Sequence, residues 1–252
     1  MTRTGADLKS MTAVEHPTCR NLLLKSLSPE DFALLAPHFT RVSLDKDKIV
    51  AAAHERLESF CFPEGGVASY SDILDDGTRI GIGMVGCEGL VGWPLLLGCE
   101  QSPYESNVAV GGAGALRIAA DDLLAACRAS PSLERLLQRF VQSFIIQLGR
   151  TVVSNLTDPV DRRLARWLLM NHDRLDGDQI DLTHQQLGVM LGVRRATVTD
   201  ALHILEGDGL VRSPRGHIVI RDRPRLRQLA GQAYGFAESE YRRLIGPFGK
   251  DC

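Results

Sequence analysis

The sequence predicts an α+β protein, with an N-terminal antiparallel β-roll joined by one long helix to a C-terminal winged helix-turn-helix. Three observations support this fold class. Short alternating or β-branched segments recur between residues 40 and 120, and apolar residues recur at steps of three and four between 131 and 157. Residues 181–220 combine two short helical patterns with a hairpin. With 252 residues, 44% of them hydrophobic, the chain is long enough for two cores.

The β-roll, with flanking helices, is expected within residues 1–129. Ser28 and Pro29 are typical of a helix start that precedes the first strand. Asp75-Asp76-Gly77 predicts a tight turn between two strands. The strands predicted from alternation and intervening turn residues are 40–44, 49–52, 59–62, 67–72, 79–85, 106–110 and 115–118.

A connecting helix is expected over residues 130–157. Ser130 and Pro131 are typical of its start, and its apolar residues form a coiled-coil-like stripe that continues to Thr157. The stripe is wider than a single seam, which fits a helix shared between its own roll and a partner subunit. Asp158-Pro159 ends the helix and makes a natural hinge, because proline interrupts the helical hydrogen bonds.

Residues 158–221 are predicted to form the winged helix-turn-helix. Thr183 and Gln186 have the spacing of a capping box, and Gly192 provides the positive φ that a tight turn between two helices needs. The apolar residues that give the two helices a common buried face are Leu187, Leu191, Val198, Ala201, Leu202 and Leu205. Residues 210–212 and 217–220 alternate about a Ser-Pro-Arg-Gly turn, as in a hairpin.

This spacing leaves two adjacent arginines, Arg194 and Arg195, at the exposed start of the second helix, which favours DNA as the partner. The net charge of the chain is −2, but residues 158–252 hold 15 basic and 13 acidic residues, a local excess of two positive charges. Two alternatives to DNA binding remain. The two helices could form a helical hairpin with only a packing role, or the winged helix could bind another protein. Residues 222–252 add a further helical pattern, to which we assign a packing role.

The segment from Asp158 through Ile220 resembles the C-terminal domain of the Crp/Fnr transcription regulators. The N-terminal half resembles their cyclic-nucleotide-binding roll more weakly, through glycines 83, 86, 89 and 92. The resemblance implies a homodimer formed through the long helix, double-stranded DNA with an inverted repeat, and RNA polymerase as a partner if the protein is an activator. The interface residues that we expect are Leu137, Phe140, Phe144 and Leu148.

The resemblance also assigns DNA contacts. Arg195 matches the arginine that holds a guanine in the major groove, while Ala196 and Asp200 replace a glutamate and an arginine of the family pattern. Thr199 completes the expected base contacts. The residues expected at phosphates, which set register, are Thr183, Gln185, Arg194, Thr197, Arg215 and His217.

The sequence departs from the family where a cyclic nucleotide would bind. Trp93 replaces a glutamate, and Tyr104-Glu105 replaces an adjacent arginine and serine, so a carboxylate is expected where the phosphate should lie. We therefore expect no control by cyclic AMP, and no cofactor or metal. The residues expected to line an apolar pocket are Glu88, Trp93, Leu95, Tyr104 and Glu105. Such a pocket would hold a non-nucleotide effector, or haem through His38, His54 or a cysteine, or its side chains would simply close it.

Other classes of function are disfavoured. The sequence has no nucleophile elbow, phosphate-binding loop or zinc-protease motif, so an enzyme is not expected. The cysteines are scattered without a Cys-x-x-Cys pair, which predicts free thiols and no iron–sulfur cluster. They are Cys19, Cys61, Cys87, Cys99, Cys127 and Cys252. No long apolar run or signal-peptide pattern occurs, so a cytoplasmic protein without a membrane anchor is expected.

Overall fold

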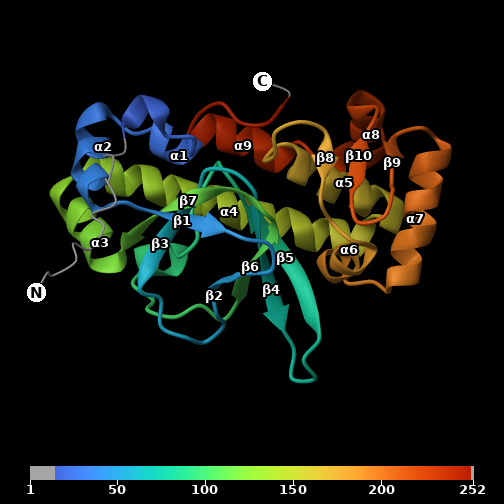
Figure 1. Ribbon diagram of the computed structural model, residues 1–252, viewed down its shortest axis with the longest axis horizontal. Coiled ribbons are helices and arrows are strands. Elements are labelled where there is room, and N and C mark those ends of the chain that lie inside the picture. Colours follow the sequence, from blue (N-terminus) through green and yellow to red (C-terminus); the bar gives the residue numbers. More distant parts are fainter. Residues whose placement is uncertain (1–14, 251–252) are drawn as a thin grey trace, which may run out of the picture.

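The computed structural model describes residues 15–250. Figure 1 shows helix α4 (Pro131–Thr157) running along most of the length of the molecule. The β-roll packs against the first part of α4, and a mainly helical unit lies at the other end. Within the described range, no helix combines the length and the apolar character needed to cross a membrane.

The roll consists of two antiparallel sheets. One sheet has the strand order β1-β7-β3 and the other β2-β6-β4-β5. Its strands are β1 (Thr40–Leu44), β2 (Ile49–Ala51), β3 (Ser59–Pro63), β4 (Val67–Ile73), β5 (Arg79–Val85), β6 (Glu105–Val110) and β7 (Gly112–Ala119). Gly77 has φ +79° in the turn between β4 and β5, which form a hairpin as expected from Asp75-Asp76-Gly77.

Short helices surround the roll. They are η1 (His16–Thr18), α1 (Leu22–Lys25), α2 (Pro29–Leu35), η2 (Ala36–His38), η3 (Trp93–Leu97) and α3 (Ala120–Ala129). The Ser28 side chain caps α2 by accepting a hydrogen bond from the Asp31 amide. Ser130 caps α4 in the same way through the Leu133 amide.

The C-terminal unit contains a helix-turn-helix and a three-stranded wing. Its elements are α5 (Val160–His172), β8 (Gln179–Ile180), α6 (His184–Leu191), α7 (Arg195–Gly207), β9 (Val211–Arg212), β10 (Ile218–Ile220) and α8 (Arg223–Ala230). We call residues 160–230 the reader. After the reader come η4 (Gly231–Ala233) and α9 (Phe236–Leu244), and α9 packs along α4. The strand order of the wing is β8-β10-β9.

Two hydrophobic cores interlock the halves of the chain. The core of the roll includes Tyr241 and Phe248, which follow the reader in sequence. The core of the reader includes side chains from the roll, on β4, β5 and β6; they are Val67, Met84, Ala109 and Val110. The β5 backbone also approaches α6 closely, because a Cβ atom on Gly81 would lie 2.7 Å from the Cα of Met190. Neither core is therefore complete within one half of the sequence.

The mixed fold class, the predicted roll strands and the extent of α4 agree with the sequence analysis. Two features differ: β8 adds a third strand to the expected hairpin of the wing, and residues 222–250 form α8, η4 and α9 rather than one helix. The five described cysteines are free, and Cys252 lies outside the described residues. Burial raises the pKa of Cys61 to about 11 and that of Cys87 to about 12, so these thiols are poor nucleophiles.

Candidate nucleic-acid interface

The geometry of the helix-turn-helix follows from a few local constraints. The Gln186 amide donates to the Thr183 hydroxyl at 3.2 Å and the Thr183 amide to Gln186 Oε1 at 3.0 Å, which completes the capping box. Gly192 ends α6 at φ +62°. A Cβ atom on Gly188 would lie 2.9 Å from the carbonyl oxygen of Val193, so glycine permits the close approach of the following turn.

The start of α7 presents the predicted base contacts to solvent. Arg195, Ala196 and Asp200 are all exposed, and Val198 and Leu202 anchor the opposite face of the helix in the reader core. Figure 1 shows α7 at the edge of the molecule farthest from the roll, so the roll does not cover it. The exposed face of α7 is therefore accessible to solvent, and beside its start Thr78 and Ile80 of the roll line a hollow together with Arg194.

Thr199 differs from its predicted role as a base contact. It is half-buried, and its hydroxyl donates to the carbonyl oxygen of Arg195 at 3.1 Å while lying 2.9 Å from Nδ1 of His184. Because both partners belong to the protein, this hydroxyl is already engaged. We therefore reassign Thr199 from base contact to internal support of α7.

The predicted phosphate contacts surround the start of α7. Arg215 stands at the exposed tip of the wing, next to Gly216 at φ +87°, and His217 is half-buried beside it. The other four are exposed, on or just before α6 and at the start of α7: Thr183, Gln185, Arg194 and Thr197. These polar residues therefore lie on α6 and in the wing as well as at the start of α7, where Arg194 and Arg195 stand.

His184 connects the two parts of the interface, and sequence reasoning missed it. Its Nδ1 lies 2.9 Å from the Thr199 hydroxyl on α7, and its Nε2 lies 3.2 Å from the Ser213 hydroxyl in the wing. Because Thr199 donates its proton to Arg195, Nδ1 of His184 must donate, and in the neutral ring Nε2 then accepts from Ser213. A lone histidine after a helix cap has no sequence pattern that would reveal such a bridge.

The five residues expected to line an effector pocket do not form one open site. Leu95 is buried and Trp93 and Tyr104 pack against the core of the roll, with the Trp93 ring 5.8 Å from that of Phe144. Glu105 is buried and paired with Arg79, whose Nε lies 3.2 Å from Oε1. A hollow of about 150 Å³ opens elsewhere on the roll, where Lys48, Cys61 and Arg117 are among its lining residues.

Glu88 faces the reader rather than a ligand. Its Oε1 accepts from Nη2 of Arg174 at 2.7 Å, and its Oε2 accepts from the Gly86 amide at 2.9 Å. The two histidines considered for haem are both exposed: His38 lies 3.3 Å from Asp122, and His54 occupies a loop at φ +62°. Neither histidine points into the core of the roll.

The dimer-interface prediction is corrected by the burial of α4. Leu137, Phe140 and Phe144 are 0%, 2% and 3% exposed in the core of their own roll, so they have no surface left for a partner. Leu148 is half-buried. The apolar side chains that α4 does expose lie on a neighbouring stripe: Ile145, Val152, Val153 and Leu156. Leu137, Phe140 and Phe144 are assigned to the partner subunit in the sequence analysis, but these large apolar side chains are buried in the roll of their own protomer.

Comparison with known proteins supports the same interpretation. Residues 162–229 match the family model of the Crp-like helix-turn-helix domain. A comparison with curated proteins gives no match. The resemblance to Crp/Fnr regulators made from the reader sequence is thereby confirmed for this domain.

Solved structures extend the likeness in fold to the rest of the chain. A Crp/Fnr-family transcriptional regulator from Eubacterium rectale is 17% identical with a TM-score of 0.64, over 82% of this chain and 97% of that one. FixK2 from Bradyrhizobium japonicum is 20% identical with a TM-score of 0.67, over 78% and 99%. The c-di-GMP responsive regulator CLP from Xanthomonas campestris is 16% identical with a TM-score of 0.62, over 77% and 99%.

The His184 bridge predicts a pH dependence of stability. Burial lowers the pKa of His184 below the usual 6.5, with Arg195 and His203 adding to the shift and Glu206 opposing it. The unfolded chain therefore takes up the proton at a higher pH than the folded chain, so this contribution is complete above about pH 6.5 and lost as the pH falls below it. We expect His184→Gln to flatten the fall in urea-unfolding free energy between pH 7.5 and 5.5.

The exposed His54 provides the control. We expect His54→Asn, which keeps a residue that tolerates positive φ, to leave the pH profile of the wild type unchanged. An equally steep profile in His184→Gln and the wild type would show that His184 titrates in the folded chain as it does in the unfolded one.

Proposed function

We propose that this chain, which has a Crp-like helix-turn-helix domain and the fold of the Crp/Fnr transcription regulators, binds an inverted DNA repeat as a homodimer and does so without cyclic AMP. The observation that carries the proposal is the arginine-led start of α7, exposed between α6 and the wing on the outer edge of the molecule. If the regulator activates transcription, RNA polymerase is its protein partner.

Sequence would be read by three side chains on α7. Arg195 can donate two hydrogen bonds to guanine O6 and N7, which contributes about 1–3 kcal/mol of discrimination. Ala196 can contact a thymine methyl group, and Asp200 can accept from a cytosine amino group or orient Arg195. Arg194, Arg215 and the polar residues around them would hold the phosphates and contribute most of the salt dependence.

Independence of cyclic AMP is supported by what fills the roll. The Phe144 ring on α4 lies 5.1 Å from the Tyr70 ring and 5.8 Å from the Trp93 ring, so aromatic side chains occupy the space between α4 and the roll. Arg79 of β5 is already paired with Glu105, and Arg174, which lies near Phe144, is already paired with Glu88. A cyclic phosphate bound between α4 and the roll would have to displace these rings and compete with Glu105 for Arg79.

One observation favours the second candidate function, a regulator gated by a small non-nucleotide effector or by haem. The Tyr70 hydroxyl, the Trp93 indole N–H and the Ser106 hydroxyl are buried close together, and none makes a well-formed hydrogen bond. Buried polar atoms of this kind usually have a partner, such as an ordered water or a ligand. A small polar molecule that opened the aromatic cluster would give them one.

The homodimer would form along the exposed stripe of α4. Gln138, Gln142, Ile145, Gly149, Val152 and Leu156 follow one another at alternating steps of four and three, which is the spacing of a two-helix seam. A Cβ atom on Gly149 would meet nothing within 4 Å in its own protomer, so the glycine leaves room at the centre of the seam for a partner helix.

Arg195→Ala should abolish sequence preference while keeping weak, salt-sensitive binding, because the phosphate contacts remain. The measurement is selection and sequencing of genomic DNA fragments by the ligand-free protein at about 0.15 M salt. The wild type and Arg128→Ala, an exposed arginine on α3, should enrich one inverted repeat. Retention of that preference by Arg195→Ala would show that the register assigned to α7 is wrong.

Cyclic AMP should leave the thermal unfolding of the protein unchanged. A ligand present at one hundred times its Kd would stabilise the folded state by about 2.7 kcal/mol, which a melting curve resolves easily. Linear 5′-AMP serves as the control for non-specific nucleotide effects. A saturable rise in Tm with cyclic AMP alone would contradict the proposed closure of the roll by Tyr70, Trp93 and Phe144.

Val152→Glu with Leu156→Glu should convert the protein to a monomer. Burying unpaired carboxylates in the seam costs several kcal/mol, so we expect the dimer Kd to rise at least about 100-fold in sedimentation experiments. Leu97→Glu changes another exposed leucine, on η3, and should leave the dimer intact. A stable dimer in the doubly substituted protein would place the interface on another surface.

A further inference from the structure

Residues 231–250, which we call the C-terminal clamp, leave the reader and return to the roll. The match to the Crp-like helix-turn-helix domain ends at residue 229, just before the clamp begins. Figure 1 shows α9 lying over α4, between the N-terminal helices and the reader. We propose that the clamp holds the reader in the orientation that exposes α7, and so takes the place of a bound effector; this rests on the proposed function.

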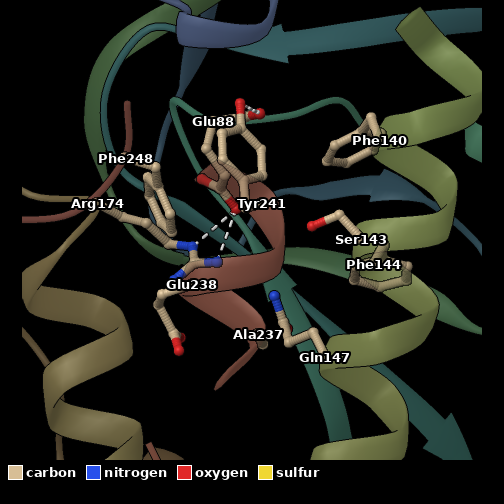
Figure 2. A pocket seen from close by; sticks show the side chains of 10 residues that line it. All are labelled: Glu88, Phe140, Ser143, Phe144, Gln147, Arg174, Ala237, Glu238, Tyr241 and Phe248. Carbon is tan, nitrogen blue, oxygen red and sulfur yellow. Dashed lines mark hydrogen bonds and ion pairs between the residues drawn. The ribbon is translucent and has the colours of Figure 1, made fainter. Parts of the chain in front are cut away.

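The clamp covers the ion pair that joins the roll to the reader (Figure 2). The Tyr241 hydroxyl donates to the carbonyl oxygen of Glu88 at 2.6 Å. The Phe248 ring lies 5.1 Å from the guanidinium of Arg174 and 4.9 Å from the Tyr241 ring. The cavity left among these side chains and α4 is only about 10 Å³, barely enough for one water molecule, so the pair is nearly dry.

The clamp also fastens the two helices on either side of the hinge. Arg166 on α5 is buried, and it donates from Nε to the carbonyl oxygen of Ala233 at 3.1 Å and from Nη2 to the Thr151 hydroxyl of α4 at 3.1 Å. Arg150 of α4 donates to the carbonyl oxygen of Gln232. The start of the clamp therefore bonds to both α4 and α5, which restricts rotation about Asp158-Pro159.

Both ends of the clamp meet at one buried carboxylate. Near its start, the Tyr234 hydroxyl donates to Asp173 Oδ2 at 2.6 Å, and at its end the Lys250 amide donates to Asp173 Oδ1 at 3.2 Å. Arg223 of α8 donates to the same Oδ1 at 2.6 Å. Asp173 directly follows α5, the first helix of the reader, so the clamp closes as a loop on the end of that helix.

The physical effect of this loop is preorganisation. A dimer reads an inverted repeat only when both α7 helices are held at the spacing of the half-sites. If only a fraction of the molecules holds that arrangement, the apparent Kd rises by the inverse of the fraction. With Phe144, Tyr70 and Trp93 filling the roll, the clamp adds to the direct contacts between β5 and α6, and together they keep this fraction high in the ligand-free protein.

The test compares graded weakening of the clamp in the full-length chain. Tyr241→Phe removes one hydrogen bond and keeps the ring, while Tyr241→Phe with Phe248→Ala also uncovers Arg174. Arg243→Ala is the control, because Arg243 is exposed on α9 and pairs with Glu240 of the same helix. Hydrogen exchange over residues 86–89 and 231–250 reports undocking, and exchange over α5–α8 reports whether the reader stays folded.

We expect faster hydrogen exchange in the clamp of the double variant. Its affinity for the selected repeat should fall at least about tenfold, which is the loss expected when the fraction of molecules with correctly spaced α7 helices falls to about a tenth. Tyr241→Phe should show a smaller loss, and Arg243→Ala none. Non-specific DNA binding at low salt should stay unchanged, because the phosphate contacts of the reader remain.

Three results would overturn the proposal. Wild-type affinity in an undocked variant would mean that the clamp only stabilises the fold, and tighter binding would mean that it inhibits the reader. If neither the wild type nor the variants select any DNA, the proposed function itself is wrong and the clamp proposal falls with it. Equal selection by docked and undocked proteins overturns the clamp alone.

Discussion

Arg174 and Glu88 form an ion pair across 86 residues of sequence, with both side chains almost inaccessible to water. Burial alone lowers the pKa of Arg174, but Glu88 and Asp173 outweigh it, and the pKa rises above its usual value. The remaining donors and acceptors are also satisfied, since Arg174 Nη1 bonds to the Met170 carbonyl at 2.7 Å and Glu88 Oε2 accepts from Gly86. Such a pair contributes little net stability, yet losing one partner costs about 3–5 kcal/mol because a charge is left buried alone.

This asymmetry explains why the reader has one orientation on the roll. Any rotation that separates Arg174 from Glu88 leaves each charge without its partner at a site where both side chains are almost inaccessible to water. Phe248 covers the guanidinium of Arg174, and Met84 of β5 lies in the hydrophobic core of the reader, while Ser143, Gln147 and Glu238 also line the site of the pair. The polar pair therefore specifies the arrangement, and the hydrophobic contacts supply most of its stability.

Local signals in the sequence were sufficient for much of the fold. The strands of the roll and the ends of α4 follow from turn residues and caps, which act over a few positions and depend little on the rest of the chain. The exposed face of α7 followed from helical spacing in the same way. The choice of partner for an apolar stripe did not follow, because periodicity shows that Phe140 and Phe144 are buried but not whether the roll or a second protomer buries them.

The same limit applies to polar residues with distant partners. Glu88 is placed in an effector pocket by the sequence analysis, and nothing near Glu88 in the sequence indicates that its partner is Arg174. Helical spacing predicts that the hydroxyl of Thr199 is available to a DNA base, whereas in the structure it is hydrogen-bonded to His184 and to the carbonyl oxygen of Arg195. Residues 231–250 carry an apolar pattern that indicates a helix, but their contacts with the roll depend on tertiary geometry alone.

The interlocked cores also limit how this protein can be recombined with others of the same fold. The reader core includes Val67, Met84, Ala109 and Val110 from the roll, and the roll core includes Tyr241 and Phe248 from the clamp. A chimera that exchanged only residues 160–230 for the equivalent domain of another protein would break apolar contacts on both sides of the join. The unit that can be transplanted with its packing intact is therefore neither half, but the reader together with the sheet face and the clamp that enclose it.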